Sequence, residues 1–304
     1  MSTIVVDNIS KSFGTKKAVD GVSFNVEPGG VFGLLGPNGA GKTTSIRIIL
    51  DIFKPDHGKV SIFGGAMTEA MKNRIGYLPE ERGLYQEVTL EKCLVYLATL
   101  KGMNEKKSQE RISEYLDQFN LSDYRKKKVK ELSKGMQQKA QLITTLVHDP
   151  ELIIIDEPFS ALDPVNTQMV KDLLREQAKL GKTIVMSTHQ MYQVEQLCDR
   201  IVLIDRGKTV LYGKLSEIRE QFSGNEIILR TESPLPTQIP GINSINSENG
   251  NLIYKAHLAE GVSPQQILQY LLSQNIILKQ FEISSPSLDE IFIQVVTKSG
   301  EHDA

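Results

Sequence analysis

The chain has 304 residues, of which 40% are hydrophobic and 24% charged, and its formal net charge of −2 gives no electrostatic reason to expect nucleic acid as the main partner. Its longest apolar runs fall far short of the ~18 residues that span a bilayer, and its N-terminus is not typical of a signal peptide. The only two cysteines, Cys93 and Cys198, lie far apart in stretches rich in Leu and Val, so we interpret them as small core or half-buried residues, consistent with a reducing compartment.

The N-terminal region predicts strands around one helix. Runs rich in β-branched residues at 3–10, 21–30 and 31–36 indicate three strands. Residues 56–65 predict a further, hairpin strand. A helix is predicted over 42–53 from the helical spacing of its apolar residues, which are Ile46, Ile49, Leu50 and Phe53.

Between the third strand and this helix lies "GPNGAGKTT", which satisfies the pattern G-x-x-x-x-G-K-[ST]. The glycines let backbone N–H groups point inward as an anion nest, and the helix N-terminus adds positive potential. We expect Lys42 to reach the β- and γ-phosphates of ATP and the Thr43 hydroxyl to hold Mg²⁺. The other predicted ATP-binding residues of this segment are Gly36, Pro37, Asn38, Gly39, Ala40, Gly41 and Thr44.

The segment "RIGYLPEERGLY" (74–85) places two acids, Glu80 and Glu81, directly after the rigid turn residue Pro79. A largely helical and polar stretch follows over 89–148. The residues themselves do not explain why two carboxylates stand here, so their function has to come from the motifs on either side.

Strands return at 151–158 and 182–189, with a helix predicted between them at 167–181 and a hairpin at 200–213. The first of these strands, "LIIIDEP", is apolar and ends in Asp156 and Glu157. We expect Asp156 to contact Mg²⁺ through water and Glu157 to polarise an attacking water, a role typically worth ~10²–10⁴-fold in rate. The competing interpretation is an acidic strand end that caps the next helix.

The composition changes near 222–225, and residues 232–251 are rich in Pro, Ser, Asn and Gly. Two strands and two helices are predicted beyond this point, which indicates a small α+β unit of about 80 residues. The strands are expected at 252–259 and 276–284, and the helices at 263–274 and 287–296.

Three further segments, "ELSKGMQQK" (131–139), "SALDP" (160–164) and "STHQ" (187–190), complete a set of five motifs in a specific order. This order resembles the nucleotide-binding subunit of ABC transporters over about residues 1–220. The resemblance implies an α/β fold: a P-loop NTPase (RecA-like) core with an antiparallel β subdomain and an inserted helical subdomain, plus a small C-terminal α+β domain. The implied ATPase domain spans 1–222, with the helical subdomain at about 81–150, and the accessory domain spans 223–304.

The resemblance also implies roles for residues outside the glycine-rich loop. Leu132, Ser133 and Gly135 match the signature motif, which binds the γ-phosphate held by the opposite protomer, and Lys134 within it is also expected to contact ATP. Lys134 and Met136 depart from the family pattern, which has glycine and glutamine there, but a lysine beside phosphates does not indicate lost activity. The remaining matches are Asp163 in the loop that crosses the dimer interface, His189 as the catalytic switch histidine, and Phe13 as the aromatic that stacks on adenine.

Glu80 takes the place of the glutamine that most of the family has in the Q-loop, which joins the catalytic core to the helical insert. A carboxylate can still ligate Mg²⁺, since hard cations favour oxygen. The alternative is a tolerated variant in a mobile loop. The "PEERGLY" form resembles one branch of the family, the bacterial ABC-2 type exporters that include sodium-extrusion ATPases.

We therefore expect an ATP-hydrolysing subunit that uses ATP and Mg²⁺, dimerises on ATP, and powers export through a separate ABC-2 type permease at the cytoplasmic face of a bacterial membrane. The cargo classes are Na⁺, a drug, a peptide or a lipid, and no nucleic acid is expected. The alternatives are a soluble ABC ATPase that acts on ribosomes or nucleic acid, and a regulator that does not hydrolyse. The chain contains a single ABC domain, which argues against the soluble ATPase. A regulator without hydrolysis is disfavoured because the chain retains Lys42, Asp156, Glu157 and His189.

Overall fold

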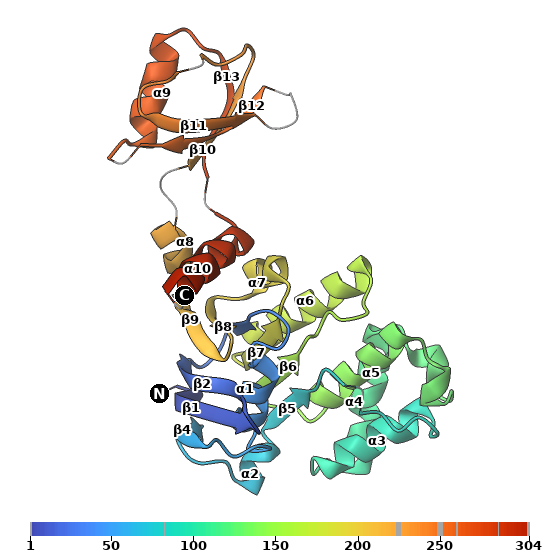
Figure 1. Ribbon diagram of the computed structural model, residues 1–304. Coiled ribbons are helices and arrows are strands. Elements are labelled where there is room, and N and C mark those ends of the chain that lie inside the picture. The colour runs from blue at the N-terminus through green and yellow to red at the C-terminus, as the bar shows by residue number, and fades with distance from the viewer. Residues whose placement is uncertain are drawn as a thin grey trace. The chain divides into compact units, whose positions relative to one another are not determined.

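The computed structural model describes residues 2–81, 83–222, 226–236, 238–247, 252–259, 261–284 and 286–302, without the side chains of 297–302. They form two compact units, Met1–Lys214 and Leu215–Ala304 (Figure 1). The predicted domain boundary falls at 222/223, and residues 223–225 lie outside the described residues. Each unit is described by itself below.

A three-stranded antiparallel sheet opens the first unit, in the order β2-β1-β4. Strand β1 spans Ile4–Phe13, β2 spans Lys16–Val26 and β4 spans His57–Ile62. The prediction of a local hairpin at 56–65 is wrong: β4 pairs with β1, because this register places Ile62 opposite Ile4 within the buried core. Strand β2 also begins before the predicted residue 21.

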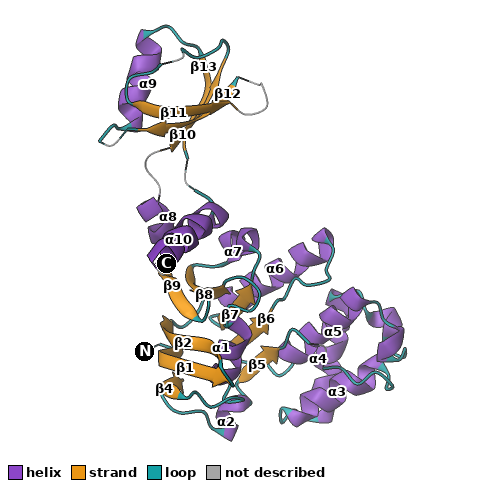
Figure 2. Ribbon diagram, in the orientation of Figure 1, coloured by secondary structure: helices purple, strands orange, loops and turns teal. Residues whose placement is uncertain are grey.

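A six-stranded sheet carries the segments predicted to be catalytic, in the order β5-β6-β7-β3-β8-β9 (Figure 2). The first five strands are parallel, and every residue of β3, β6 and β7 is buried, as expected of a sheet covered on both faces. The carboxyl ends of parallel strands meet at one edge, where α/β sheets bind ligands. The bounds are β3 Val31–Leu35, β5 Ile75–Leu78, β6 Leu152–Asp156, β7 Thr183–Thr188, β8 Arg200–Asp205 and β9 Lys208–Lys214.

Helix α1 spans Lys42–Ile49, and its side chains share one buried core with residues of both sheets. It ends four residues before the predicted Phe53. The reason is local: Leu50 caps the helix and Asp51 takes a left-handed conformation with φ of 60°, which an α-helix cannot include.

Three helices, α3, α4 and α5, form a separate group next to β5 (Figure 1). Helix α6 begins at Pro164, earlier than the predicted 167, because Asp163 caps it and proline suits the first helical position. The short helices α2 and α7 were not predicted. The bounds are α2 Glu69–Lys72, α3 Leu90–Leu100, α4 Glu105–Gln118, α5 Lys134–Leu146, α6 Pro164–Lys179 and α7 Met191–Leu197.

The second unit contains a four-stranded antiparallel sheet in the order β11-β12-β10-β13, whose core includes Ile267 and Leu271 of α9. Strand β11 lies inside the stretch predicted as turn-rich, because its polar sequence pairs with the more apolar β12. The bounds are α8 Leu215–Phe222, β10 Glu226–Thr231, β11 Ile242–Ser247, β12 Ile253–Leu258, α9 Pro264–Ser273, β13 Leu278–Ile283 and α10 Leu288–His302.

Two predictions from composition can be compared with these units. Every helix in the described part of the chain is too short or too polar to cross a bilayer. Cys93 and Cys198 are both free and buried, as predicted.

Candidate nucleotide-binding site

The glycine-rich loop joins β3 to α1 and packs tightly against its neighbours. Gly36 and Gly41 have backbone φ angles of 147° and 109°, which residues with a Cβ rarely adopt. A Cβ at Gly36 would lie 2.0 Å from the carbonyl oxygen of Ile204, and one at Gly41 would lie 2.4 Å from that of Ala18. The loop conformation therefore requires glycine at both positions.

Lys42, the first residue of α1, is buried and reaches back over the loop. Its Nζ donates to the carbonyl oxygens of Gly36 at 2.8 Å and Pro37 at 3.1 Å. Burial lowers the pKa of Lys42, while the nearby negative charges, Glu157 first among them, act to raise it. The ammonium therefore lies over the loop, where phosphate oxygens could replace the two carbonyl oxygens as its hydrogen-bond acceptors.

A cavity of about 380 Å³ opens beside this loop, and we refer to this candidate site as the nucleotide cavity. Phe13 stands at its wall, 47% exposed, with its ring edge-on to Phe53 at 5.5 Å between centroids. Lys16 faces Phe13 in the β1–β2 register and was missed by the sequence prediction. The cavity is lined by Phe13, Lys16, Ala18, Asn38, Gly39, Gly41, Lys42, Thr43, Thr44, Glu80, Asp156 and Glu157.

Asp156 ends β6 and has one carboxylate oxygen engaged and one available. Its Oδ1 accepts a hydrogen bond from the hydroxyl of Ser187, which the sequence prediction also missed. Its Oδ2 is buried and has no hydrogen-bond partner among the described residues. Thr43 lines the same cavity. An unpartnered carboxylate oxygen and a hydroxyl are oxygen donors that fit Mg²⁺, which proteins usually hold through one or two carboxylates plus substrate phosphates.

No group of three or more His, Cys, Asp or Glu able to cage a metal occurs in the described part of the chain. A cation at Asp156 would therefore take its other ligands from the Thr43 hydroxyl, nucleotide oxygens and water.

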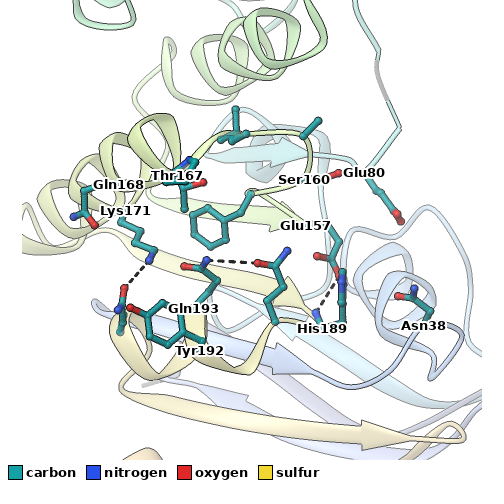
Figure 3. Close-up of a pocket in the computed structure, with 16 residues that line it drawn as sticks. Asn38, Glu80, Glu157, Ser160, Thr167, Gln168, Lys171, His189, Tyr192 and Gln193 are labelled. Carbon is teal, nitrogen blue, oxygen red and sulfur yellow. Dashed lines mark hydrogen bonds and ion pairs between the residues drawn. The ribbon is translucent and has the colours of Figure 1, made fainter. Parts of the chain in front are cut away.

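Glu157 follows Asp156 with a φ of 52°, unusual for a residue other than glycine. Its carboxylate is held by the end of β7: Oε1 accepts the backbone N–H of His189 at 3.1 Å and lies 2.8 Å from Nδ1 of the same residue. Thr188, not predicted from the sequence, donates to Oε2 at 3.2 Å. The two predicted catalytic side chains are thus in direct contact (Figure 3).

Glu80 is exposed and lines the nucleotide cavity from the loop after β5. It is close enough to Lys42 to favour the charged form of that ammonium. The same loop is tied to α5, because Nε2 of Gln141 donates to the carbonyl oxygen of Glu81 at 3.3 Å. The residue that follows, Arg82, lies outside the described residues.

Ser133, Lys134, Gly135 and Asp163 do not line this cavity. Ser133 caps α5, its hydroxyl accepting the N–H of Met136 at 3.2 Å. Asp163 caps α6, and hydrogen bonds from Asn166 lower the pKa of its carboxyl group. The single chain therefore gathers the loop, Phe13, Glu80, Asp156, Glu157 and His189 in one region, and leaves these four residues elsewhere.

Family models match most of the chain. The model described as "ABC transporter" matches residues 19–160, and the one described as "ATP-binding protein DrrA1-3-like, C-terminal domain" matches residues 213–296. The chain is similar to YhaQ of Bacillus subtilis (strain 168), described as an uncharacterized ABC transporter ATP-binding protein. The two are 40% identical over 301 residues, which cover 96% of this chain and 98% of YhaQ.

A second relative is Nod factor export ATP-binding protein I of Rhizobium etli. It is 36% identical over 231 residues, which cover 75% of this chain and 73% of the relative. Among solved structures, an ATP binding subunit of an ABC transporter matches with a TM-score of 0.68 and 32% identity, covering 73% of this chain and 93% of that one.

Proposed function

This chain belongs to the ABC transporter family as an ATP-binding subunit, and on that premise we propose that it hydrolyses ATP as a dimer of two copies to drive export through a separate permease. The observation that carries the proposal is the contact between Glu157 and His189 at the sheet edge that also presents the glycine-rich loop.

Hydrolysis in this proposal follows from the side chains at that edge. The loop N–H groups and Lys42 bind the phosphates, and Phe13 stacks on the adenine. Glu157 accepts a hydrogen bond from the attacking water and takes its proton as the water oxygen bonds to the γ-phosphorus and the bond to the ADP oxygen breaks. His189 turns toward the γ-phosphate, while Thr188 and the His189 backbone N–H keep the carboxylate in place.

The residues that we propose to hold Mg²⁺ are Thr43, Asp156 and Glu80. When bound, the ion would neutralise charge on the phosphate oxygens. Asp156 has the strongest support, because its Oδ2 is buried without a hydrogen-bond partner among the described residues. Glu80 adds a negative charge at the cavity wall, so we propose that it makes activity more dependent on Mg²⁺ concentration than a glutamine would.

The dimer is supported by the residues that the single chain leaves outside its own cavity. Ser133 caps α5, and Lys134 and Gly135 begin its first turn, where backbone N–H groups are suited to an anion. We propose that they bind the γ-phosphate held by the second copy, with Asp163 at the interface between copies. ATP would then join the two copies, and hydrolysis would separate them through charge repulsion.

Export is supported by the name of the Rhizobium etli relative and by the predicted ABC-2 branch. We propose a peripheral location at the cytoplasmic face of a bacterial membrane, with an ABC-2 type permease as partner and the loop around Glu80 transmitting movement to it. Cargo contacts would lie on the permease, so Na⁺, a drug, a peptide and a lipid all stay within the proposal.

Co-purification of the chain with its membrane partner, followed by ATPase assays with candidate cargoes in vesicles, tests this function. We expect a complex whose ATPase rate rises with cargo. A chain that hydrolyses ATP but associates with ribosomes instead of membranes would favour the soluble alternative, and a chain without any ATP hydrolysis would overturn the proposal.

A further inference from the structure

A second cavity, of about 750 Å³, adjoins the reaction site and contains a charge that the proposed mechanism does not use. Glu157 and His189 line one part of it, and Lys171 of α6 lines another (Figure 3). Lys171 is only 4% exposed, whereas lysines are almost never that deeply buried unless they are paired.

Lys171 has no carboxylate partner among the described residues. Its Nζ donates to Oε1 of Gln196 at 2.5 Å and lies 5.9 Å and 5.4 Å from the ring centroids of Phe159 and Tyr192. The adjacent Asp172 is engaged elsewhere, with Arg175 at 3.0 Å. One amide oxygen and two aromatic faces therefore take the place of a counter-ion.

This arrangement is costly, because an ammonium loses its hydration on burial and only an opposite charge compensates fully. Burial lowers the pKa of Lys171 and the charge of Arg175 lowers it further, while the charge of Asp172 acts to raise it. An anion placed in the cavity would offset the effects of burial and of Arg175. The buried charge is therefore explained most simply by a ligand that brings a negative charge.

The charges along the cavity are unequally distributed. Its carboxylates are Glu80 and Glu157, which also line the nucleotide cavity, whereas the part near Lys171 is lined by neutral polar side chains such as Thr167, Gln168 and Gln193. A small oxyanion released at Glu157 would be repelled there and attracted toward Lys171.

We propose that this second cavity receives the orthophosphate released from ATP, with Lys171 as its counter-charge, before the phosphate leaves the protein. The inference rests on the proposed ATPase function and deepens it by assigning a product-binding site away from the glycine-rich loop.

Equilibrium dialysis with radiolabelled orthophosphate, in the presence of ADP and Mg²⁺, measures this binding without requiring turnover. We expect saturable binding to the wild-type protein and an affinity at least about tenfold weaker in Lys171→Met, the loss typical of one charge-assisted hydrogen bond. The matched control is Lys179→Met, an exposed lysine on the same helix, which should bind orthophosphate as the wild type does.

A second variant guards against misfolding of Lys171→Met. Gln193→Glu is a nearly isosteric change that adds a negative charge at the half-buried cavity wall, and it should weaken orthophosphate binding severalfold while the protein stays folded. No saturable binding to the wild type, or wild-type affinity in either folded variant, would overturn the assignment. ATP hydrolysis by the wild type, assayed separately, shows whether the ATPase function itself fails.

Discussion

The imidazole Nδ1 of His189 lies 2.8 Å from Oε1 of Glu157, and this oxygen also accepts the backbone N–H of His189 at 3.1 Å. Only the first contact involves the histidine side chain. The imidazole can therefore turn toward a phosphate while its own backbone and the Thr188 hydroxyl keep the carboxylate aimed. One residue would thus serve both as a sensor and as a fixed support for the base.

Lys42→Ala should lose ATP binding, because it removes a charge-assisted contact to the phosphates. The expected loss is about 10–100-fold in affinity. Titration with a fluorescent ATP analogue measures it, with Lys54→Ala as the control, since Lys54 is exposed and pairs with Asp51 at 2.6 Å. Wild-type affinity for ATP in folded Lys42→Ala would contradict the assignment of the glycine-rich loop as the phosphate-binding site.

Glu80→Gln should keep the fold and ATP binding, because the two side chains are nearly isosteric. It should change the Mg²⁺ dependence of hydrolysis, since a charged oxygen ligand becomes a neutral one. Glu80→Ala should go further and uncouple ATP use from transport. ATPase rate against Mg²⁺ concentration, with transport measured in parallel in vesicles, checks both.

Glu81→Gln is the matched control for these variants, because Glu81 is the adjacent exposed acid and does not line the nucleotide cavity. Overlapping Mg²⁺ curves and equal transport per ATP in wild type, Glu80→Gln and Glu80→Ala would show that Glu80 is a tolerated surface variant.

Removal of the second unit should leave the fold and ATP binding of the first unit intact. From the composition change near 222–225 alone we would cut the chain at Asn225, but that residue lies outside the described residues. The compact first unit ends at Lys214, so a chain of residues 1–214 should fold cooperatively and bind ATP as the full chain does. Circular dichroism melting and ATP titration test this. A cooperatively folded chain that hydrolyses no ATP, even with its permease, would mean that the second unit supplies a catalytic group.

His148 should make stability depend on pH. Its Nε2 lies 3.1 Å from the carbonyl oxygen of Ile75 at the start of β5, and burial lowers its pKa from 6.5 to about 4. Between pH 6.5 and about pH 4 the unfolded chain binds a proton at His148 that the folded chain does not bind. The free energy of unfolding therefore falls as the pH falls from 6.5 toward 4. The loss should approach about 3 kcal/mol.

Urea denaturation of wild type and His148→Gln across this pH range isolates the contribution of His148 to stability, because the Asp and Glu carboxylates titrate in both proteins. The advantage of the wild type over the variant should shrink as the pH falls. Parallel curves for the two proteins would contradict the buried, neutral imidazole.

The sequence was enough to predict the P-loop NTPase fold, which the solved ABC subunit confirms. A motif such as "LIIIDEP" combines an apolar run with acids at its end, so a local pattern predicts both the buried strand and the end at which the acids lie. Strand pairing was less predictable. β4 pairs with β1 about 50 residues away, and no local pattern separates that choice from a hairpin.

Contacts between separate elements were also missed. Ser187 and Thr188 donate hydrogen bonds to the two acids at the end of β6. These contacts form only because β7 lies beside β6. Nothing in the sequence around Lys171 distinguishes it from an exposed helical lysine, and the packing of α7 and Phe159 against it gives its ammonium a buried environment. Tertiary neighbours, and not sequence spacing, decide such roles.

The most direct measurement is the mass in solution of Glu157→Gln with and without ATP and Mg²⁺, by size-exclusion chromatography with light scattering. The substitution removes the base and keeps the phosphate contacts, so we predict a monomer without nucleotide and a stable dimer with ATP. ATPase activity should fall at least about 100-fold, while Glu114→Gln, an exposed control on α4, should keep its activity. A Glu157→Gln protein that stays monomeric with ATP and hydrolyses it near the wild-type rate would contradict the account.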